Sequence, residues 1–251
     1  MRVLLISDVH ANLEALEACL AAAPSFDVAI NLGDIVGYGA SPNEVIELAR
    51  RECRLHVRGN HDKVCAGLTS AEGFNPVAAM AAHWTRQALT AENLEWLRGL
   101  PAGPLTLERI EDVQFVHGSP LDEDDYMIGV TDSVEPLLRT AARITFFGHS
   151  HLQGGFSLYN DYGSEIHTYI ELGGGFDTSA LALHPRARYM INPGSVGQPR
   201  DGDWRAGFAV FESDPLTVTF FRVPYDVKRA QQRILEAQLP ERLASRLTIG
   251  R

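Results

Sequence analysis

Asp, His and Asn, residue types that can bind metal ions, occur at five points of this sequence, each directly after an apolar run that predicts a β-strand. Glycine stands beside four of them, where it allows a sharp turn or a close approach of the backbone. In open α/β sheets ligands bind beyond the carboxyl ends of the strands, so we expect these side chains to meet at one sheet edge. The five segments are Ser7-Asp8-Val9-His10, Gly33-Asp34, Gly59-Asn60-His61-Asp62, His117-Gly118 and Gly148-His149-Ser150-His151.

Each segment alone has an ordinary explanation. An Asp after a strand is usually a turn former, and a single His on a strand is usually structural. The ligand set taken from them would be four histidines, two aspartates and one asparagine, too many for one tetrahedral zinc but suited to two ions with five or six ligands. We therefore predict a site for two metals, in which one loop contributes both His149 and His151. The predicted ligands are Asp8, His10, Asp34, Asn60, His117, His149 and His151.

The composition limits which classes of protein are possible. The chain has 251 residues, of which 45% are hydrophobic, so it has the composition of a globular protein with a sizeable core. Its net charge of −10 argues against nucleic acid as the main partner. Three cysteines without zinc-site spacing indicate reduced thiols, and the sequence shows no membrane span or signal peptide. We expect a cytoplasmic protein; the sequence does not set its oligomeric state.

The order of predicted elements favours an α/β fold. Strand, helix, strand, helix and strand alternate over residues 2–58, which predicts parallel βαβ units. Ser41 and Pro42 mark the start of the second helix. Two helices follow over 74–98, then short strands interrupted by a helix at about 131–141, and a final helix from about Val227 that breaks near Pro240. We predict one domain over 1–251, with two mixed β-sheets packed face to face and helices outside.

In this order, the five segments resemble the calcineurin-like metallophosphoesterase superfamily. They cover residues 6–151, and the sequences DVHANLEAL and INPGSVGQPRDGD resemble in particular its small bacterial and archaeal phosphodiesterase-like members. The resemblance implies a four-layer αββα fold and the hydrolysis of a small phosphodiester or phosphomonoester. It also implies two divalent transition-metal ions (Mn, Fe, Co, Ni or Zn) that activate a water molecule.

The resemblance also implies roles for individual residues. His61 is the expected general acid, or a hydrogen-bond donor to the phosphoryl group. Asn12 and Asp62 are candidates for orienting ligands, with helix capping and turn formation as their alternatives, and Asn12 is also a candidate for binding substrate. The implied ligands are Asp8, His10 and His151 for the first metal, Asn60, His117 and His149 for the second, and Asp34 for both.

One departure bears on the substrate. Protein phosphatases of the superfamily read Gly-Asp-x-x-Asp-Arg-Gly at the second segment, whereas this chain has Gly37 and Tyr38 where they have Asp and Arg. Without that arginine, and with an acidic loop at 119–127, we expect a singly charged diester to be favoured, and the Tyr38 ring to offer an aromatic face. Arg58 and Arg200 are the candidates to replace the missing cation.

The sequence leaves open the roles of three further candidate residues. Arg58 either faces the substrate or packs on the surface, and the loop 192–203, with Ser195 and Arg200, is either a wall of the substrate pocket or a turn. The alternative functions are activity like that of a phosphoprotein phosphatase, hydrolysis of a dinucleoside polyphosphate, and an inactive scaffold for protein interactions. Loss of ligand residues would indicate the scaffold, and none is missing.

Overall fold

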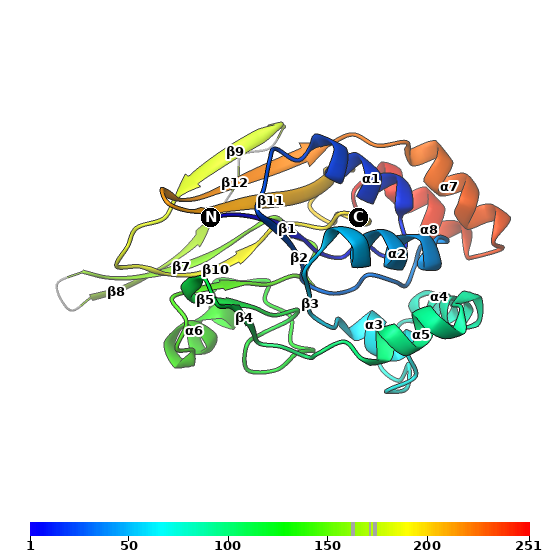
Figure 1. Cartoon of the computed structure of the whole chain (residues 1–251), viewed down its shortest axis with the longest axis horizontal. Coiled ribbons are helices and arrows are strands. Elements are labelled where there is room, and N and C mark those ends of the chain that lie inside the picture. Colours follow the sequence, from blue (N-terminus) through cyan, green and yellow to red (C-terminus); the bar gives the residue numbers. More distant parts are fainter. Residues whose placement is uncertain (162–163, 171, 173–174) are drawn as a thin grey trace.

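Two mixed β-sheets of six strands each form the centre of the computed structural model, which describes residues 1–161, 164–170, 172 and 175–251 (Figure 1). The strands are β1 (Arg2–Ile6), β2 (Val28–Asn31), β3 (Leu55–His56), β4 (Leu105–Leu107), β5 (Ile110–Phe115), β6 (Ile144–Phe146), β7 (Gly154–Asp161), β8 (Ser164–Ile170), β9 (Thr178–Ala182), β10 (Arg188–Asn192), β11 (Ala206–Ser213) and β12 (Leu216–Val223). Their order is β3-β2-β1-β11-β12-β9 in one sheet and β4-β5-β6-β10-β7-β8 in the other.

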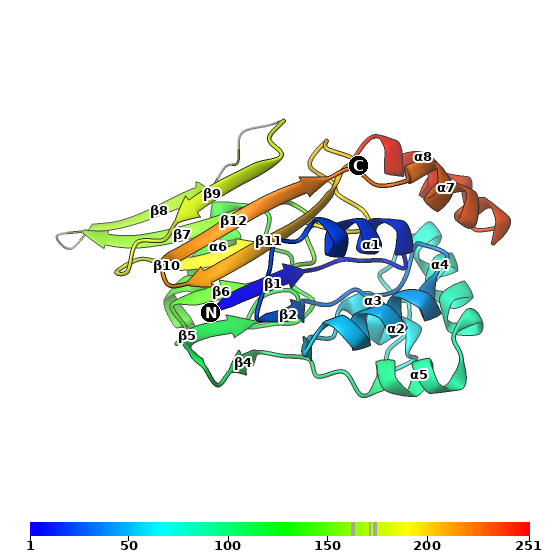
Figure 2. The same cartoon turned by 45° about the horizontal axis from the view of Figure 1, so that its top comes forward.

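Helices cover the outer faces of both sheets, as predicted (Figure 1). They are α1 (Leu13–Ala22), α2 (Pro42–Glu52), α3 (Asn60–Cys65), α4 (Pro76–Ala88), α5 (Ala91–Arg98), α6 (Val130–Arg139), α7 (Val227–Glu236), α8 (Glu241–Ser245) and the short 3-10 helix η1 (Arg246–Thr248). Figure 2 shows α7 and α8 beside α1, and Arg233 of α7 forms an ion pair with Glu14 of α1 at 2.6 Å.

Strand β1 shows why the sequence specifies two packed faces. Val3 and Leu5 pack in the core between the sheets, whereas Leu4 and Ile6 pack against the helices on the opposite face. Because successive side chains of a strand point to opposite faces, a strand covered on both sides needs an unbroken apolar run. The sequence RVLLI has that run, and its last four residues are buried.

Parallel strands bring the five predicted segments together. In the first sheet β1 pairs in parallel with β2, and β2 with β3, so the loops that follow them leave at the same edge. In the second sheet β5, β6 and β10 are also parallel neighbours. Their loops carry His117, the segment 148–151 and the segment 193–200, which meet the loops of the first sheet.

Some elements differ from the prediction. Strands β7 and β9 were not predicted: β7 begins with two glycines, and β9 consists of small, half-exposed residues. Helix α3 follows β3 directly and has only six residues, too few for a helical pattern. Ser41 precedes α2 as predicted, but its hydroxyl makes no capping hydrogen bond. A single domain over 1–251 stays a prediction.

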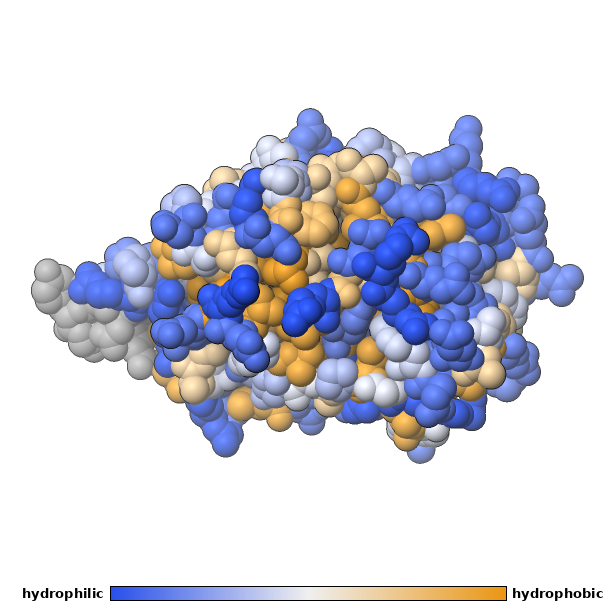
Figure 3. Space-filling view, viewed as in Figure 1, coloured by the Kyte–Doolittle hydropathy of each residue, from blue (hydrophilic) through white to orange (hydrophobic). Residues whose placement is uncertain are grey.

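Within the described ranges, no helix is long and apolar enough to cross a bilayer. Figure 3 shows hydrophilic residues over much of one face, with apolar residues visible between them.

Candidate metal centre

Six of the seven predicted ligands form two buried groups. Asp8, His10, Asp34 and His151 make one group, and Asp34, His117 and His149 make the other; within each group one possible ligand atom per residue lies within 4.8 Å of the rest. Asp34 belongs to both groups. The structure thus assembles these residues as the sequence predicts, whereas their roles as ligands remain a proposal.

Asp34 lies between the two groups. Its Oδ2 atom is 3.6 Å from His10 Nε2 and 3.5 Å from His117 Nε2. Its Oδ1 atom accepts a hydrogen bond from the backbone N–H of His61 at 2.8 Å. One carboxylate oxygen therefore faces a histidine of each group, the geometry that a bridging ligand needs.

The other side chains of each group are equally close. In the first group, His151 Nε2 lies 3.1 Å from His10 Nε2 and 3.3 Å from Asp8 Oδ1. In the second, the amide Oδ1 of Asn60, the seventh predicted ligand, lies 3.2 Å from His117 Nε2. Nitrogen and oxygen atoms of uncharged and anionic groups thus converge on two points, a donor set that suits two transition-metal ions.

All four histidines of the groups are held by backbone carbonyls. When a carbonyl accepts the N–H of one ring nitrogen, the lone pair of the other nitrogen is directed elsewhere, and metal-binding histidines are commonly oriented in this way. In His10, His117 and His151 the second nitrogen, Nε2, faces the carboxylates of Asp8 or Asp34. The four contacts are His10 Nδ1 to Val36 at 3.1 Å, His117 Nδ1 to Leu32 at 2.8 Å, His149 Nε2 to Asp124 at 3.1 Å and His151 Nδ1 to Gln198 at 2.6 Å.

Backbone strain is concentrated at this site. Among the described residues, nine other than glycine have positive φ, and seven of them lie in the loops of the site: Asp8, His10, Ala11, Asp34, Tyr38, His149 and His151. This conformation is uncommon for residues with a Cβ atom, and strain of this kind is typical of functional sites. Backbone hydrogen bonds hold the loops in place, for example from Asp8 to Gly33 and from His10 to Asp34.

Glycine is required where two loops meet. A Cβ atom on Gly59 would lie 2.1 Å from Asp34 Oδ1, and one on Gly37 would lie 2.6 Å from His61 Nδ1. Asp62 joins the same loops, because its carboxylate accepts the N–H groups of Gly59 and Val36 at 3.0 and 3.2 Å. The bond to Gly59 caps α3, the alternative that the sequence offered for Asp62, while the bond to Val36 links α3 to the loop of Asp34. The orienting role stays a prediction.

Burial and charge shift the titration of these groups. Burial lowers the pKa of His149 to about 3 and raises the pKa of Asp8 to about 7. Burial also opposes ionisation of His117 and Asp34, but their mutual attraction prevails, so the pKa of His117 rises to about 10 and that of Asp34 falls well below its usual range. Buried carboxylates beside the imidazoles of His10, His149 and His151, whose pKa values burial lowers, favour a bound cation.

His61 lies next to the two groups without belonging to either. Its ring packs against Tyr38 and Phe74, with centroids 4.4 and 4.6 Å away. Its Nδ1 atom is buried over Gly37 and has no hydrogen-bond partner among the described residues. Its ring also lies 4.9 Å from that of His10, so His61 stands beside the first group, and its contact with substrate stays a prediction.

Asn12 and Ser195 brace the site from within the protein. The Asn12 amide caps α1 through the N–H of Ala15 and donates to the carbonyl of Gly197. The Ser195 hydroxyl donates to the carbonyl of Asp8 and accepts the N–H of Gln198. These bonds engage both side chains inside the protein, a geometry that does not support the predicted contact with substrate.

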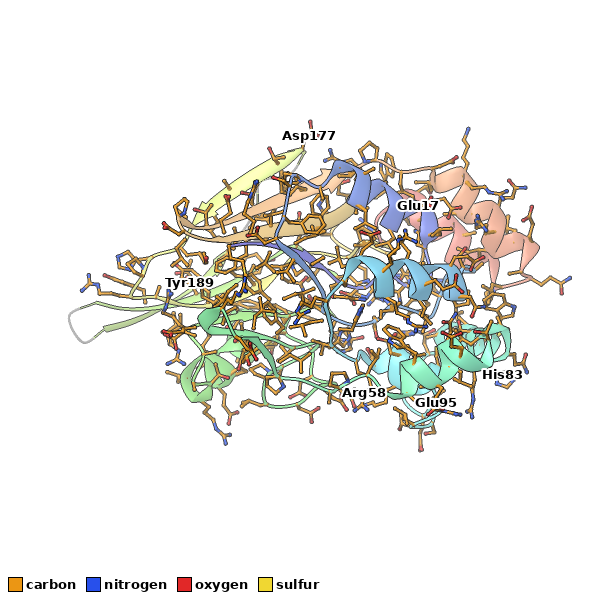
Figure 4. The ribbon with its side chains drawn as sticks, in the orientation of Figure 1. Glu17, Arg58, His83, Glu95, Asp177 and Tyr189 are labelled. Atoms are coloured by element: carbon orange, nitrogen blue, oxygen red, sulfur yellow. The ribbon has the colours of Figure 1, made fainter. Side chains whose placement is uncertain are left out.

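Arg58 is paired with the acidic loop 119–127. Its guanidinium binds both carboxylate oxygens of Glu123 at 2.9 and 3.0 Å, and Lys63 binds Glu123 and Asp124. Figure 4 shows Arg58 between β4 and α3. The predicted replacement of the missing cation by Arg58 is therefore not supported, and the loop is less repulsive than its sequence suggests, since two cations offset its charge.

Tyr38 and Arg200 lie together over the first group. The ring of Tyr38 packs 4.7 Å from that of His10 and only 7% of the residue is exposed, so the predicted open aromatic face is absent. The Arg200 guanidinium lies 5.8 Å from the Tyr38 centroid. Arg200 thus lies beside the first group, and its replacement of the missing cation, one of the two alternatives from the sequence, stays a prediction.

Sequence reasoning missed two residues at the site. Tyr126 stacks on His149 with centroids 3.6 Å apart, and with Phe74 it lines a cleft that reaches Asn60 and His149. Arg246 of η1 lies 5.9 Å from the Tyr38 ring. Neither Tyr126 nor Arg246 belongs to a motif. The only sign in the sequence was that Tyr126 directly follows the acidic residues of the loop 119–127.

Comparisons with known proteins agree with the geometry. Residues 1–215 match the family model described as the calcineurin-like phosphoesterase superfamily domain. An uncharacterized protein of Methanocaldococcus jannaschii is 37% identical over 253 residues, which span 99% of this chain and 98% of that protein. A metallophosphoesterase of Sphaerobacter thermophilus is 41% identical with a TM-score of 0.83, covering 100% of this chain and 99% of that one. A hypothetical protein of Pyrococcus horikoshii, 21% identical with a TM-score of 0.78, covers 100% and 98% and shares the fold.

Proposed function

The chain belongs to the calcineurin-like phosphoesterase superfamily, and on this premise we propose that it hydrolyses a small phosphoester with two divalent transition-metal ions. The observation that carries the proposal is the position of Asp34, one carboxylate shared by two buried groups of ligands. A structural role alone does not require two such groups where the loops of the two sheets meet.

Seven side chains would hold the ions. Their mixture of imidazole, carboxylate and amide donors suits Mn, Fe, Co, Ni or Zn better than calcium, which prefers oxygen ligands. Bound ions of this kind supply a hydroxide nucleophile at neutral pH and neutralise charge on the phosphoryl oxygens. The assignment is Asp8, His10 and His151 for one ion, Asn60, His117 and His149 for the other, and Asp34 for both.

Residues around the ligands would contribute to catalysis or hold the ligand loops in position. His61 would donate a proton to the leaving group or a hydrogen bond to the phosphoryl oxygen. Arg200 would supply a positive charge beside the ring of Tyr38. Asp62 and Ser195 keep the ligand loops in position through the bonds described above.

We expect strict dependence on metal. Exhaustive chelation should lower turnover of nitrophenyl phosphate by ~10²-fold or more, because the ions contribute several kcal/mol of charge stabilisation. Adding back Mn²⁺, Co²⁺ or Zn²⁺ should restore it, which a steady-state assay with each metal would measure. Hydrolysis that survives chelation unchanged would contradict the proposal.

The same assay separates the alternatives. A panel with phosphomonoesters, phosphodiesters, a phosphopeptide and a dinucleoside polyphosphate would distinguish a phosphatase or a polyphosphate hydrolase from a diesterase. Absence of turnover with every metal and every substrate would favour the scaffold for protein interactions. The complete set of ligand side chains opposes that outcome.

A further inference from the structure

Two arginines from distant parts of the chain meet over one ring. Arg200 follows β10, and Arg246 begins η1; their guanidinium carbons lie 5.8 and 5.9 Å from the centroid of Tyr38. The same ring contacts His10 and His61 at the edge of the metal centre. Tyr38 therefore forms a common platform for two positive charges beside the site.

Neither guanidinium is neutralised by a side-chain carboxylate within the described ranges. Arg200 Nη2 donates to the amide oxygen of Gln198 at 3.1 Å, and its Nε is buried without a partner. Arg246 Nε donates to the backbone oxygen of Arg251. Burial, and then the charge of Arg200, lower the pKa of Arg246 to about 10. Two half-buried, mutually repelling cations would be stabilised by an anion between them.

Arg200 also connects the two sides of the metal centre. Its guanidinium interacts with the hydroxyl groups of both Tyr38 and Tyr126. Tyr38 packs on His10 of the first group, whereas Tyr126 stacks on His149 of the second. An anion held by Arg200 would thus lie close to both groups of ligands.

Arg200 and Arg246 change the expectation about the charge of the substrate. The sequence favoured a singly charged diester because Tyr38 stands where related phosphatases have arginine. In the fold, Arg200 and Arg246 occupy the space around that tyrosine, so the premise that the site lacks a cation does not hold. Guanidinium groups bind phosphate oxygens through paired, charge-assisted hydrogen bonds, which are stronger for a dianion.

We propose that Arg200 and Arg246 form an arginine clamp for a dianionic phosphoryl group, so that the substrate is a phosphomonoester rather than a phosphodiester. The substrate class rests on the proposed function, whereas the binding of a phosphate dianion by the clamp does not. The clamp makes Arg246 a determinant of specificity supplied by the C-terminal segment.

The test compares Arg246→Gln and Arg200→Gln with Arg242→Gln, which removes the same charge from an exposed position of α8. Binding of inorganic phosphate in buffer with Mn²⁺ is measured by isothermal titration calorimetry. Each clamp variant should weaken it by ~10-fold, or about 1.4 kcal/mol, because it loses a hydrogen bond to a charged group. Arg242→Gln should leave it within about twofold. Arg246→Lys, which keeps the charge, should retain part of the affinity.

The second measurement is kcat/KM for nitrophenyl phosphate and bis-nitrophenyl phosphate with the same metal and pH. Arg246→Gln should lose about tenfold on the monoester and less than about threefold on the diester, because the diester carries one charge fewer. Equal losses on both substrates, or a wild type that prefers the diester after correction for intrinsic reactivity, would overturn the assignment of substrate class.

The two measurements separate the clamp from the proposed function. If phosphate binding falls in the clamp variants but no substrate is turned over, the clamp stands and the proposed function fails. If turnover is normal and phosphate binding is unchanged in both variants, the clamp fails and the proposed function stands. An equal loss of phosphate binding in Arg242→Gln would reduce the effect to general surface charge and overturn the clamp.

Discussion

Replacing Asp34 with Asn should be among the most damaging single changes, lowering kcat/KM by ~10³-fold or more. The substitution keeps the size of the side chain, and its amide oxygen can still accept the N–H of His61. It removes the one negative charge that faces His10 and His117 together. Because both proposed ions depend on this charge, their occupancy and the rate should fall together.

The control for this change is Glu17→Gln, which removes a carboxylate exposed on α1 (Figure 4). It should leave kcat/KM and thermal stability unchanged, as surface charges usually contribute little. Steady-state kinetics and circular dichroism of both variants make the comparison. Near-normal turnover of Asp34→Asn with full metal content would refute the bridging role.

Replacing His61 with Ala should separate catalysis from metal binding. The ions should remain bound, since His61 is not a proposed ligand, while the rate should fall by roughly 10²–10⁴-fold if it donates a proton. The loss should be smallest for substrates with a good leaving group such as nitrophenolate, which needs little protonation. A series of aryl and alkyl phosphates, assayed at one pH and metal concentration, measures this dependence.

His83→Ala is the matched control for that experiment. His83 is exposed on α4, where it contacts Gln87, and lies at the outer edge of the molecule (Figure 4). This variant should behave as the wild type. For His61→Ala, a loss that is equal across leaving groups would favour a hydrogen bond to the phosphoryl group, and an unchanged rate would exclude both roles.

The sequence was most informative where chemistry and strand ends coincide. Asp8 and Asp34 follow neighbouring parallel strands of the first sheet, and His117 follows β5 of the second. The loops at the carboxyl ends of both sheets meet, which brings Asp34 and His117 together. This is why the two groups of ligands could be predicted residue by residue. Helix α3 was missed because six residues contain too little periodicity to distinguish a helix from a turn.

Contacts between distant segments could not be predicted from the sequence. Arg58 and Glu123 are 65 residues apart, so nothing local showed that the acidic loop is partly neutralised. The burial of Tyr38 depends on residues that reach it from η1 at the other end of the chain. Ser195 is bonded to the loop of Asp8, 187 positions away, which turns a predicted substrate contact into a brace. Such pairings follow from the packing of two sheets, which local pattern does not encode.

The central claim is that two ions share Asp34, and calorimetric titration of the metal-free wild type with Mn²⁺ tests it most directly. The account predicts two ions bound per chain, with both binding events weakened in Asp34→Asn, because one carboxylate oxygen lies between His10 and His117. A single ion per chain at full activity, or two ions whose affinities are unaffected by Asp34→Asn, would contradict it.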